Sequence, residues 1–123
     1  MIYQIYYGDL NSRKVLFDIE YYITCSDEPN DMGYDNKWYL ELDSYPFISN
    51  AVFFIRTLKP EQLEEFSKDC KELEELRGCI WEKHGNRCRT LQEAEKDKKE
   101  WGVYIEDTIK KFCDKYGLFL NID

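Results

Sequence analysis

The residues best suited to metal chemistry lie in one short segment, residues 79–89. It contains Cys79, His84 and Cys88, and Cys70 lies upstream on an apolar helical stripe. Zinc favours cysteine and histidine ligands in tetrahedral sets, so a zinc-stabilised adaptor is one hypothesis. The spacing lacks the close cysteine pair of a zinc knuckle, however. A basic loop with two ordinary thiols explains the same residues, and we expect no bound metal or cofactor.

The same segment is where histidine-dependent catalysis would have to occur, because His84 is the one histidine in the chain. Cys79 or Cys88 would act as a nucleophile if nearby positive charge stabilised its thiolate. Three basic residues of the segment supply such charge: Lys83, Arg87 and Arg89. An exposed histidine in a turn is the simpler interpretation. The chain has no phosphate-binding glycine loop and no nucleophile elbow, so we expect no enzyme. A thiol- or carboxylate-dependent hydrolase is the alternative.

The charge balance favours a protein partner. The chain has 25 acidic and 17 basic side chains and a net charge of −8. Contact with nucleic-acid phosphates or an anionic membrane demands Lys and Arg, and the few basic residues near Trp81 are too few to supply it. We therefore expect no direct nucleic-acid binding and no membrane binding. An acidic surface is suited to a basic site on another protein.

Composition predicts a single folded domain over residues 1–123. Hydrophobic residues make up 43% of the chain and aromatic residues 16%, which is enough for a core. There is no secretory signal and no apolar run long enough to span a bilayer. The five cysteines are odd in number and irregularly spaced, so we expect free thiols in a cytoplasmic protein. The oligomeric state is left open.

Three strands are predicted in the first half of the chain. Residues 2–7 form a β-prone aromatic run, and residues 13–24 alternate between apolar and polar positions, so the two should pair as a hairpin. A third strand is predicted over residues 37–43, and Ser44-Tyr45-Pro46 should break it. Residues 47–58 fit either a helix or a buried strand, and we favour the strand.

Two long helices are predicted in the second half. Pro60 suits the first position of a helix that Gly78 should end. The second helix covers residues 90–116, with Thr90 as N-cap and Gly117 after its last turn. Within it Gly102 marks a kink or a close contact. Its apolar stripe includes Trp101, Ile105, Ile109 and Phe112. Residues 118–122 should add a last short strand.

These elements predict an α+β fold: an antiparallel sheet of four to five strands with two long helices packed on one face. The other face would then be exposed or used by a partner. The acidic loop of residues 25–36 and the first long helix supply the expected partner-binding surface, with aromatic anchors ringed by charge. Its predicted residues are Asp27, Glu28, Asp31, Tyr34, Asp35, Tyr39, Glu61, Glu65, Glu72 and Glu75.

The function we expect is that of a small acidic inhibitor that binds another protein. The site that it occupies on its target would be a basic, nucleic-acid-binding site. In its small size, acidity, single α+β domain and lack of catalytic motifs, the chain is similar to many bacterial toxin-immunity proteins and phage-encoded inhibitors of host defence. This is a likeness of profile and not of motif. It does not separate an immunity protein from an anti-defence or anti-CRISPR protein.

Overall fold

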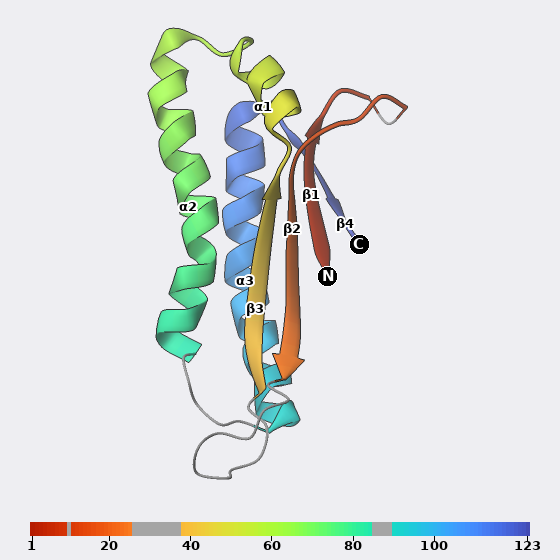
Figure 1. The fold of residues 1–123 in the computed structure, drawn as a ribbon, viewed down its shortest axis with the longest axis vertical. Helices are drawn as coiled ribbons and strands as arrows, with labels where there is room; N and C mark the ends of the chain where they lie inside the picture. Colours follow the sequence, from red (N-terminus) through yellow and green to blue (C-terminus); the bar gives the residue numbers. More distant parts are fainter. Residues whose placement is uncertain (10, 26–37, 85–89) are drawn as a thin grey trace.

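The computed structural model describes residues 1–9, 11–25, 38–84 and 90–123, except for the side chains of Cys25, Tyr39, Trp81, Lys83 and His84. Strands β1 (Ile2–Tyr7), β2 (Lys14–Cys25) and β3 (Trp38–Pro46) come first in the chain. Helices α1 (Ile48–Ile55), α2 (Pro60–His84) and α3 (Leu91–Tyr116) follow, and β4 (Phe119–Ile122) is last. The described strands form one antiparallel sheet in the order β3-β2-β1-β4. The predicted α+β class and antiparallel sheet are therefore confirmed (Figure 1).

The β1–β2 hairpin forms as the alternation predicts, with one irregularity. Ile5 pairs with Phe17 but Tyr6 pairs with Val15, so Leu16 is the extra residue of a β-bulge. Strict alternation would put Leu16 on the polar face, yet both Leu16 and Phe17 are buried. The bulge thus adds a core residue that the period-two pattern does not predict.

The prediction that residues 47–58 form a strand is wrong, and so is the predicted break of β3 at Ser44-Tyr45-Pro46. The strand continues to Pro46, which pairs with Phe17 at the sheet edge, where a proline is tolerated. The chain then turns into α1. Asn50 donates from Nδ2 to the carbonyl of Val15 at 2.9 Å, and Phe54 enters the core. A helix buries Phe54 and leaves the rest of this apolar run largely exposed.

Helix α2 does not end at Gly78 as predicted. It begins at Pro60, as expected, and continues through Gly78 to His84. The apolar stripe explains the extension, because Leu73, Leu76 and Ile80 are all buried. Burial of a side chain as large as Ile80 contributes about 1.5–3 kcal/mol, which exceeds the cost of about 1 kcal/mol for a glycine inside a helix. Most of the predicted link at residues 79–89 is therefore helical.

Helix α3 has the predicted start and end. The Thr90 side chain accepts a hydrogen bond from the backbone N–H of Glu93 at 3.2 Å. Gly117 adopts the left-handed conformation with φ of 66°. The helix is continuous at Gly102, and a Cβ there would meet the Tyr21 ring at 3.9 Å. That distance is an ordinary van der Waals contact, so an alanine would fit here and neither the predicted kink nor a contact that requires glycine is found.

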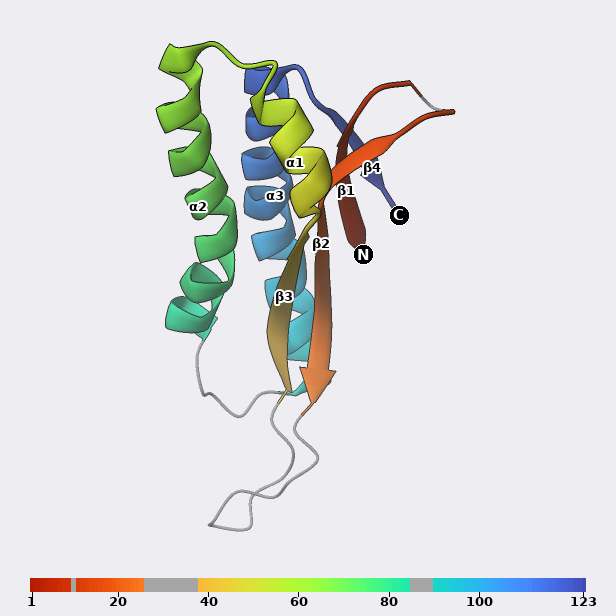
Figure 2. The same ribbon diagram turned by 45° about the horizontal axis from the view of Figure 1, so that its top comes forward.

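The core lies between α3 and one face of the sheet, with α2 beside α3 at the β3 edge, so the prediction that two long helices pack on one face is met only in part. Helix α3 contacts β2, β3 and β4, whereas α2 packs against β3 and α3, and Figure 2 shows α2 standing beside α3. A cluster of buried aromatic rings joins the sheet to the helices. Each ring contacts at least one other ring of the cluster, which consists of Phe17, Phe54, Phe66, Phe112 and Tyr116. The buried stripe predicted for α3 is confirmed at Ile105, Ile109 and Phe112, and Trp101 is half-buried.

Candidate protein-binding surface

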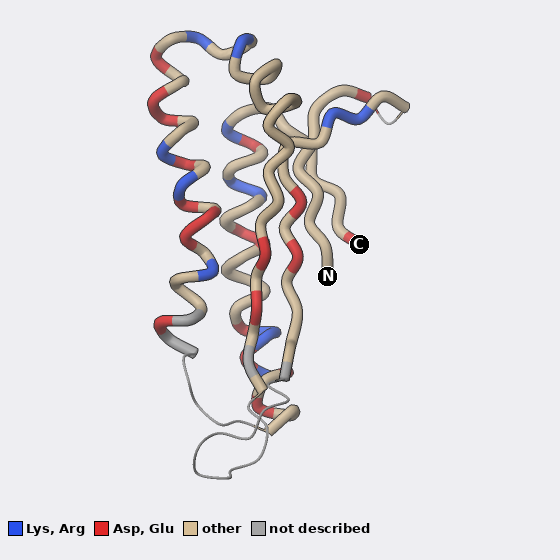
Figure 3. Tube along the Cα trace, in the orientation of Figure 1, with Lys and Arg blue, Asp and Glu red and all other residues tan. Residues whose placement is uncertain are grey.

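The face of β2 and β3 that points away from α3 carries acidic and tyrosine side chains. We call it the acidic sheet face, and it consists of Asp18, Glu20, Tyr22, Glu41, Asp43 and Tyr45. Across the two strands Asp18 is opposite Tyr45, Glu20 is opposite Asp43, and Tyr22 is opposite Glu41. The alternate residues Phe17, Ile19 and Tyr21 are buried on the core side. Figure 3 shows the acidic residues of these strands along their middle part.

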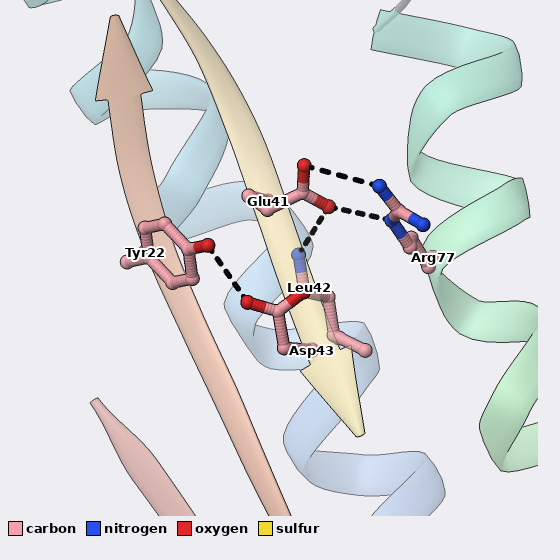
Figure 4. Close-up of polar contacts among 5 residues, drawn as sticks. All are labelled: Tyr22, Glu41, Leu42, Asp43 and Arg77. Carbon is pink, nitrogen blue, oxygen red and sulfur yellow. Dashed lines mark hydrogen bonds and ion pairs between the residues drawn. The ribbon is translucent and has the colours of Figure 1, made fainter. Parts of the chain in front are cut away.

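Hydrogen bonds fix two of these side chains (Figure 4). The Tyr22 hydroxyl donates to Oδ2 of Asp43 at 2.7 Å. This hydrogen bond is the main reason that the pKa of Tyr22 is raised to about 12, and burial adds to it. Tyr22 therefore stays protonated and keeps Asp43 in place at neutral pH. The result is a fixed tyrosine–carboxylate pair on a sheet surface.

Glu41 is the one acidic residue of this face that is neutralised from a helix. Arg77 of α2 donates from Nε to Oε1 of Glu41 at 2.7 Å, and the backbone N–H of Leu42 donates to the same oxygen at 3.2 Å. Glu41 is only 8% exposed, so this pairing satisfies a carboxylate that would otherwise be costly to bury. Glu41 thus ties α2 to the edge strand β3.

Neither Glu20 nor Asp43 forms an ion pair with a Lys or Arg in the part of the chain that the structure describes. The pKa of Arg77 is raised mainly by its hydrogen bond to Glu41, and the charge of Asp43 contributes less. Like charges directly opposite one another on adjacent strands are destabilising, by roughly 0.2–1 kcal/mol on the scale of cross-strand pairs. A Lys or Arg from outside the molecule would turn this repulsion into attraction. The acidic sheet face is therefore chemically suited to a basic ligand, and its tyrosines offer apolar contact.

The four acidic residues predicted on α2 lie on its surface, but one of them is paired with α3. Glu61, Glu65, Glu72 and Glu75 are all exposed. Lys115 of α3 lies 2.6 Å from Oε1 of Glu65 and 2.8 Å from Oδ2 of Asp69. Glu72 lines a groove of about 290 Å³ between α2 and α3, together with Lys111 and Lys115. The charge of this stripe is thus partly balanced within the molecule.

The remaining predicted binding residues are not placed. Asp27, Glu28, Asp31, Tyr34 and Asp35 lie outside the described residues, as does the side chain of Tyr39. The structure therefore leaves the contribution of the acidic loop as a prediction.

The thiol and metal candidates are only partly described. Cys79 is exposed on α2 and lines a groove of about 480 Å³ with Glu82, Glu100, Trp101 and Tyr104. No basic side chain lines this groove among the described residues, although a nucleophilic thiolate needs nearby positive charge. His84 ends α2 with its side chain undescribed, and Cys88 lies outside the described residues.

Cys70 is a poor metal ligand in this fold. It packs half-buried against the core, and that burial raises the pKa of its thiol to about 12. Metals bind the thiolate, so binding at neutral pH would have to overcome this shift. The described residues contain no group of three His, Cys, Asp or Glu side chains that could hold a metal ion.

Comparisons of the chain with protein-family models, with curated proteins and with solved structures gave no match. Among the described helices, none has both the length and the apolar character that crossing a bilayer requires.

The sequence predicted the outward positions of β2 and β3, but of these only Tyr39 was assigned to the binding surface. The missing information was the register of the two strands. Loop length and turn type set the register of a hairpin when the turn is short, but twelve residues separate β2 from β3. Only the folded structure places Glu20 opposite Asp43.

Proposed function

We propose that this protein acts by binding another protein, whose basic surface docks on the acidic sheet face. The observation that supports this most strongly is the pair of Glu20 and Asp43, two carboxylates opposite each other that form no ion pair with a described Lys or Arg. Repulsion between these carboxylates destabilises the free protein, and a basic ligand would relieve it. The pair is therefore suited to binding such a ligand. The neighbouring Tyr22 and Tyr45 add the aromatic contacts that protein interfaces favour.

A stoichiometric inhibitor of a nucleic-acid-binding protein fits this chemistry. Such a target presents clustered Lys and Arg side chains, because phosphate contact demands them. An acidic protein that covers this cluster would compete with the nucleic acid. The toxin-immunity and phage anti-defence types of inhibitor are both compatible with this mode of action. Electrostatic attraction would accelerate association and make it sensitive to salt.

The test is affinity purification of partners with the full chain and with one charge-reversed variant, Glu20→Lys. This variant should keep its fold, because the new lysine faces Asp43. We expect the wild-type chain to retain a protein with a basic surface, and Glu20→Lys to associate with it at least tenfold more slowly. The matched control is Glu64→Lys, which makes the same change of charge at an exposed position of α2 outside the predicted binding residues.

Two outcomes would overturn the proposal. One is equal recovery of the same protein by the wild-type chain and by Glu20→Lys. The other is an association rate that does not change with salt. Reversal of Asp27, Glu28, Asp31 and Asp35 together tests the acidic loop separately. If only this loop variant loses the partner, the binding site lies in the loop and not on the acidic sheet face.

A further inference from the structure

The exposed side of α1 is apolar, which is unusual for a helix at the surface of so charged a protein. Ile48 is 73% exposed and Phe53 61%. With their neighbours they form what we call the α1 patch, which consists of Phe47, Ile48, Val52, Phe53 and Ile55. All five are among the exposed large hydrophobic residues of the chain. Surface patches of this kind commonly mark interaction sites.

Internal contacts fix the orientation of α1, so the patch cannot turn inward. Asn50 and Phe54 lie on the opposite side of the helix. Asn50 bonds to the Val15 carbonyl, and its own carbonyl accepts from the Tyr7 hydroxyl at 3.4 Å. The Phe54 ring packs on Tyr7 and Phe66 at centroid distances of 5.5 Å. A rotation that hid Ile48 would expose Phe54 and break these bonds.

The exposed area suits a small dimer interface. Large aromatic side chains carry roughly 150–250 Å² each, so the five partly exposed residues leave on the order of 500 Å² accessible. This is near the upper end for the largest patch of a monomer, about 300–600 Å². A standard interface buries about 800 Å² per partner. The patch and its polar surroundings together approach that size.

Charge favours a second copy at this patch. Residues 44–60 contain no Asp or Glu, although the chain has a net charge of −8. Two such molecules repel each other where their acidic surfaces meet, and the α1 patch lets them touch without bringing carboxylates together. Figure 3 shows α1 free of acidic residues at the end of the molecule where β3 finishes. One nearby cation, Arg56, lies over its own Phe53 ring at 5.6 Å.

We propose that the α1 patch is a homodimer contact, in which α1 of one copy packs against α1 of a second copy across a two-fold axis. An interface of this symmetry uses the same surface on both subunits. An anionic bilayer is a weaker candidate, because lipid-binding segments gather about four to eight Lys or Arg residues. Residues 44–60 contain two, Arg56 and Lys59. The dimer would leave the acidic sheet face of each copy free, so this inference does not depend on the proposed function.

The oligomeric state of the full chain tests the proposal. Sedimentation velocity and light scattering over a range of concentrations should show a mass near twice the 14.9 kDa of one chain. The double variant Ile48→Ser, Phe53→Ser should dimerise at least tenfold more weakly, with an unchanged circular dichroism spectrum. The matched control is Val103→Ser on α3, because Val103 is 72% exposed but lies outside the patch. This control should remain a dimer.

A second pair of variants tests the symmetry and does not depend on the fold of the double variant. Val52→Glu and Val52→Lys should each be monomeric, because like charges then meet at the interface. An equal mixture should recover the dimer. A wild-type chain that stays monomeric at hundreds of micromolar would overturn the proposal. So would patch-dependent sedimentation of a monomer with phosphatidylserine vesicles, since this would assign the patch to a bilayer.

Discussion

Glu20 and Asp43 lie directly opposite each other on β2 and β3, and a hydrogen bond from Tyr22 holds Asp43 in place. Neither carboxylate forms an ion pair with a basic side chain among the described residues. This arrangement places fixed negative charge on the sheet surface beside Glu41, which Arg77 of α2 neutralises. It combines a cost in stability with a site for a basic ligand, and these two properties can be measured independently.

Replacing Glu20 with Lys should stabilise the free protein. The new lysine would face Asp43, so repulsion becomes attraction, and we expect a gain of about 0.2–1 kcal/mol. Urea melts of the wild-type chain, Glu20→Lys and Glu64→Lys measure it, and the α2 control should stay within about 0.5 kcal/mol of wild type. A lower midpoint for Glu20→Lys than for the control would show that the pair does not repel. If Glu20→Lys is more stable than wild type and still loses its partner, misfolding does not explain the loss of binding.

Replacing Phe112 with Ala should destabilise the fold severely. The Phe112 ring lies 5.7 Å from that of Phe66 and 5.2 Å from that of Tyr116, and the residue is buried. Loss of a core phenylalanine costs about 3–5 kcal/mol, a large part of a typical stability of about 5–15 kcal/mol. Lys99→Ala, on the exposed side of the same helix, should change stability by about 0.5 kcal/mol or less. Similar urea midpoints for the two variants would contradict the assigned core.

Asp69 should make stability depend on acid pH. Burial alone would raise the pKa of its carboxyl group, but hydrogen bonds from Lys115 and Tyr116 outweigh burial and lower this pKa. A pKa that is lower in the folded than in the unfolded state stabilises fully above about pH 4, and the gain is lost as pH falls through the folded value. Asp69→Asn should therefore lower the urea midpoint at pH 7, and the difference from wild type should shrink below pH 4.

The control for this pH dependence is Asp107→Asn, which removes a carboxylate from an exposed pair with Lys111 on the surface of α3. Exposed pairs of this kind contribute little, so its midpoint should follow that of wild type throughout. The partners of Asp69 should make stability depend on alkaline pH. The pKa values of Lys115 and Tyr116 are raised, so their stabilisation is present below about pH 10 and is lost as pH rises further. A difference between Asp69→Asn and wild type that persists at pH 3 would contradict this account.

The thiols should differ widely in reactivity. Burial raises the pKa values of Cys70 and Cys113 to about 12, whereas Cys79 is exposed. Alkylation needs the thiolate and access to it. Iodoacetamide at pH 8, followed by mass spectrometry, should therefore modify Cys79 well before Cys70 and Cys113. In denaturing urea the three rates should converge. Early modification of Cys70 in the folded protein would restore it as a candidate ligand or nucleophile.

Local patterns in the sequence were sufficient to predict several elements. The alternation of residues 13–24 predicted β2, and Thr90 and Gly117 marked the ends of α3. The stripe of Ile105, Ile109 and Phe112 identified the side of α3 that is buried. These predictions succeeded because strand alternation, helix capping and the helical period depend on neighbours within a few residues.

The tertiary structure decided what those patterns left open. Residues 47–58 are apolar enough for a strand or a helix, and the packing of Phe54 against α2 and β1 selected the helix. Gly78 would end an isolated helix, but burial of Ile80 carried α2 past it. The acidic sheet face required the register of β2 against β3, and the α1 patch required knowledge of which side of α1 meets the core. Each of these depends on contacts between residues far apart in the chain, whose energies a local pattern does not contain.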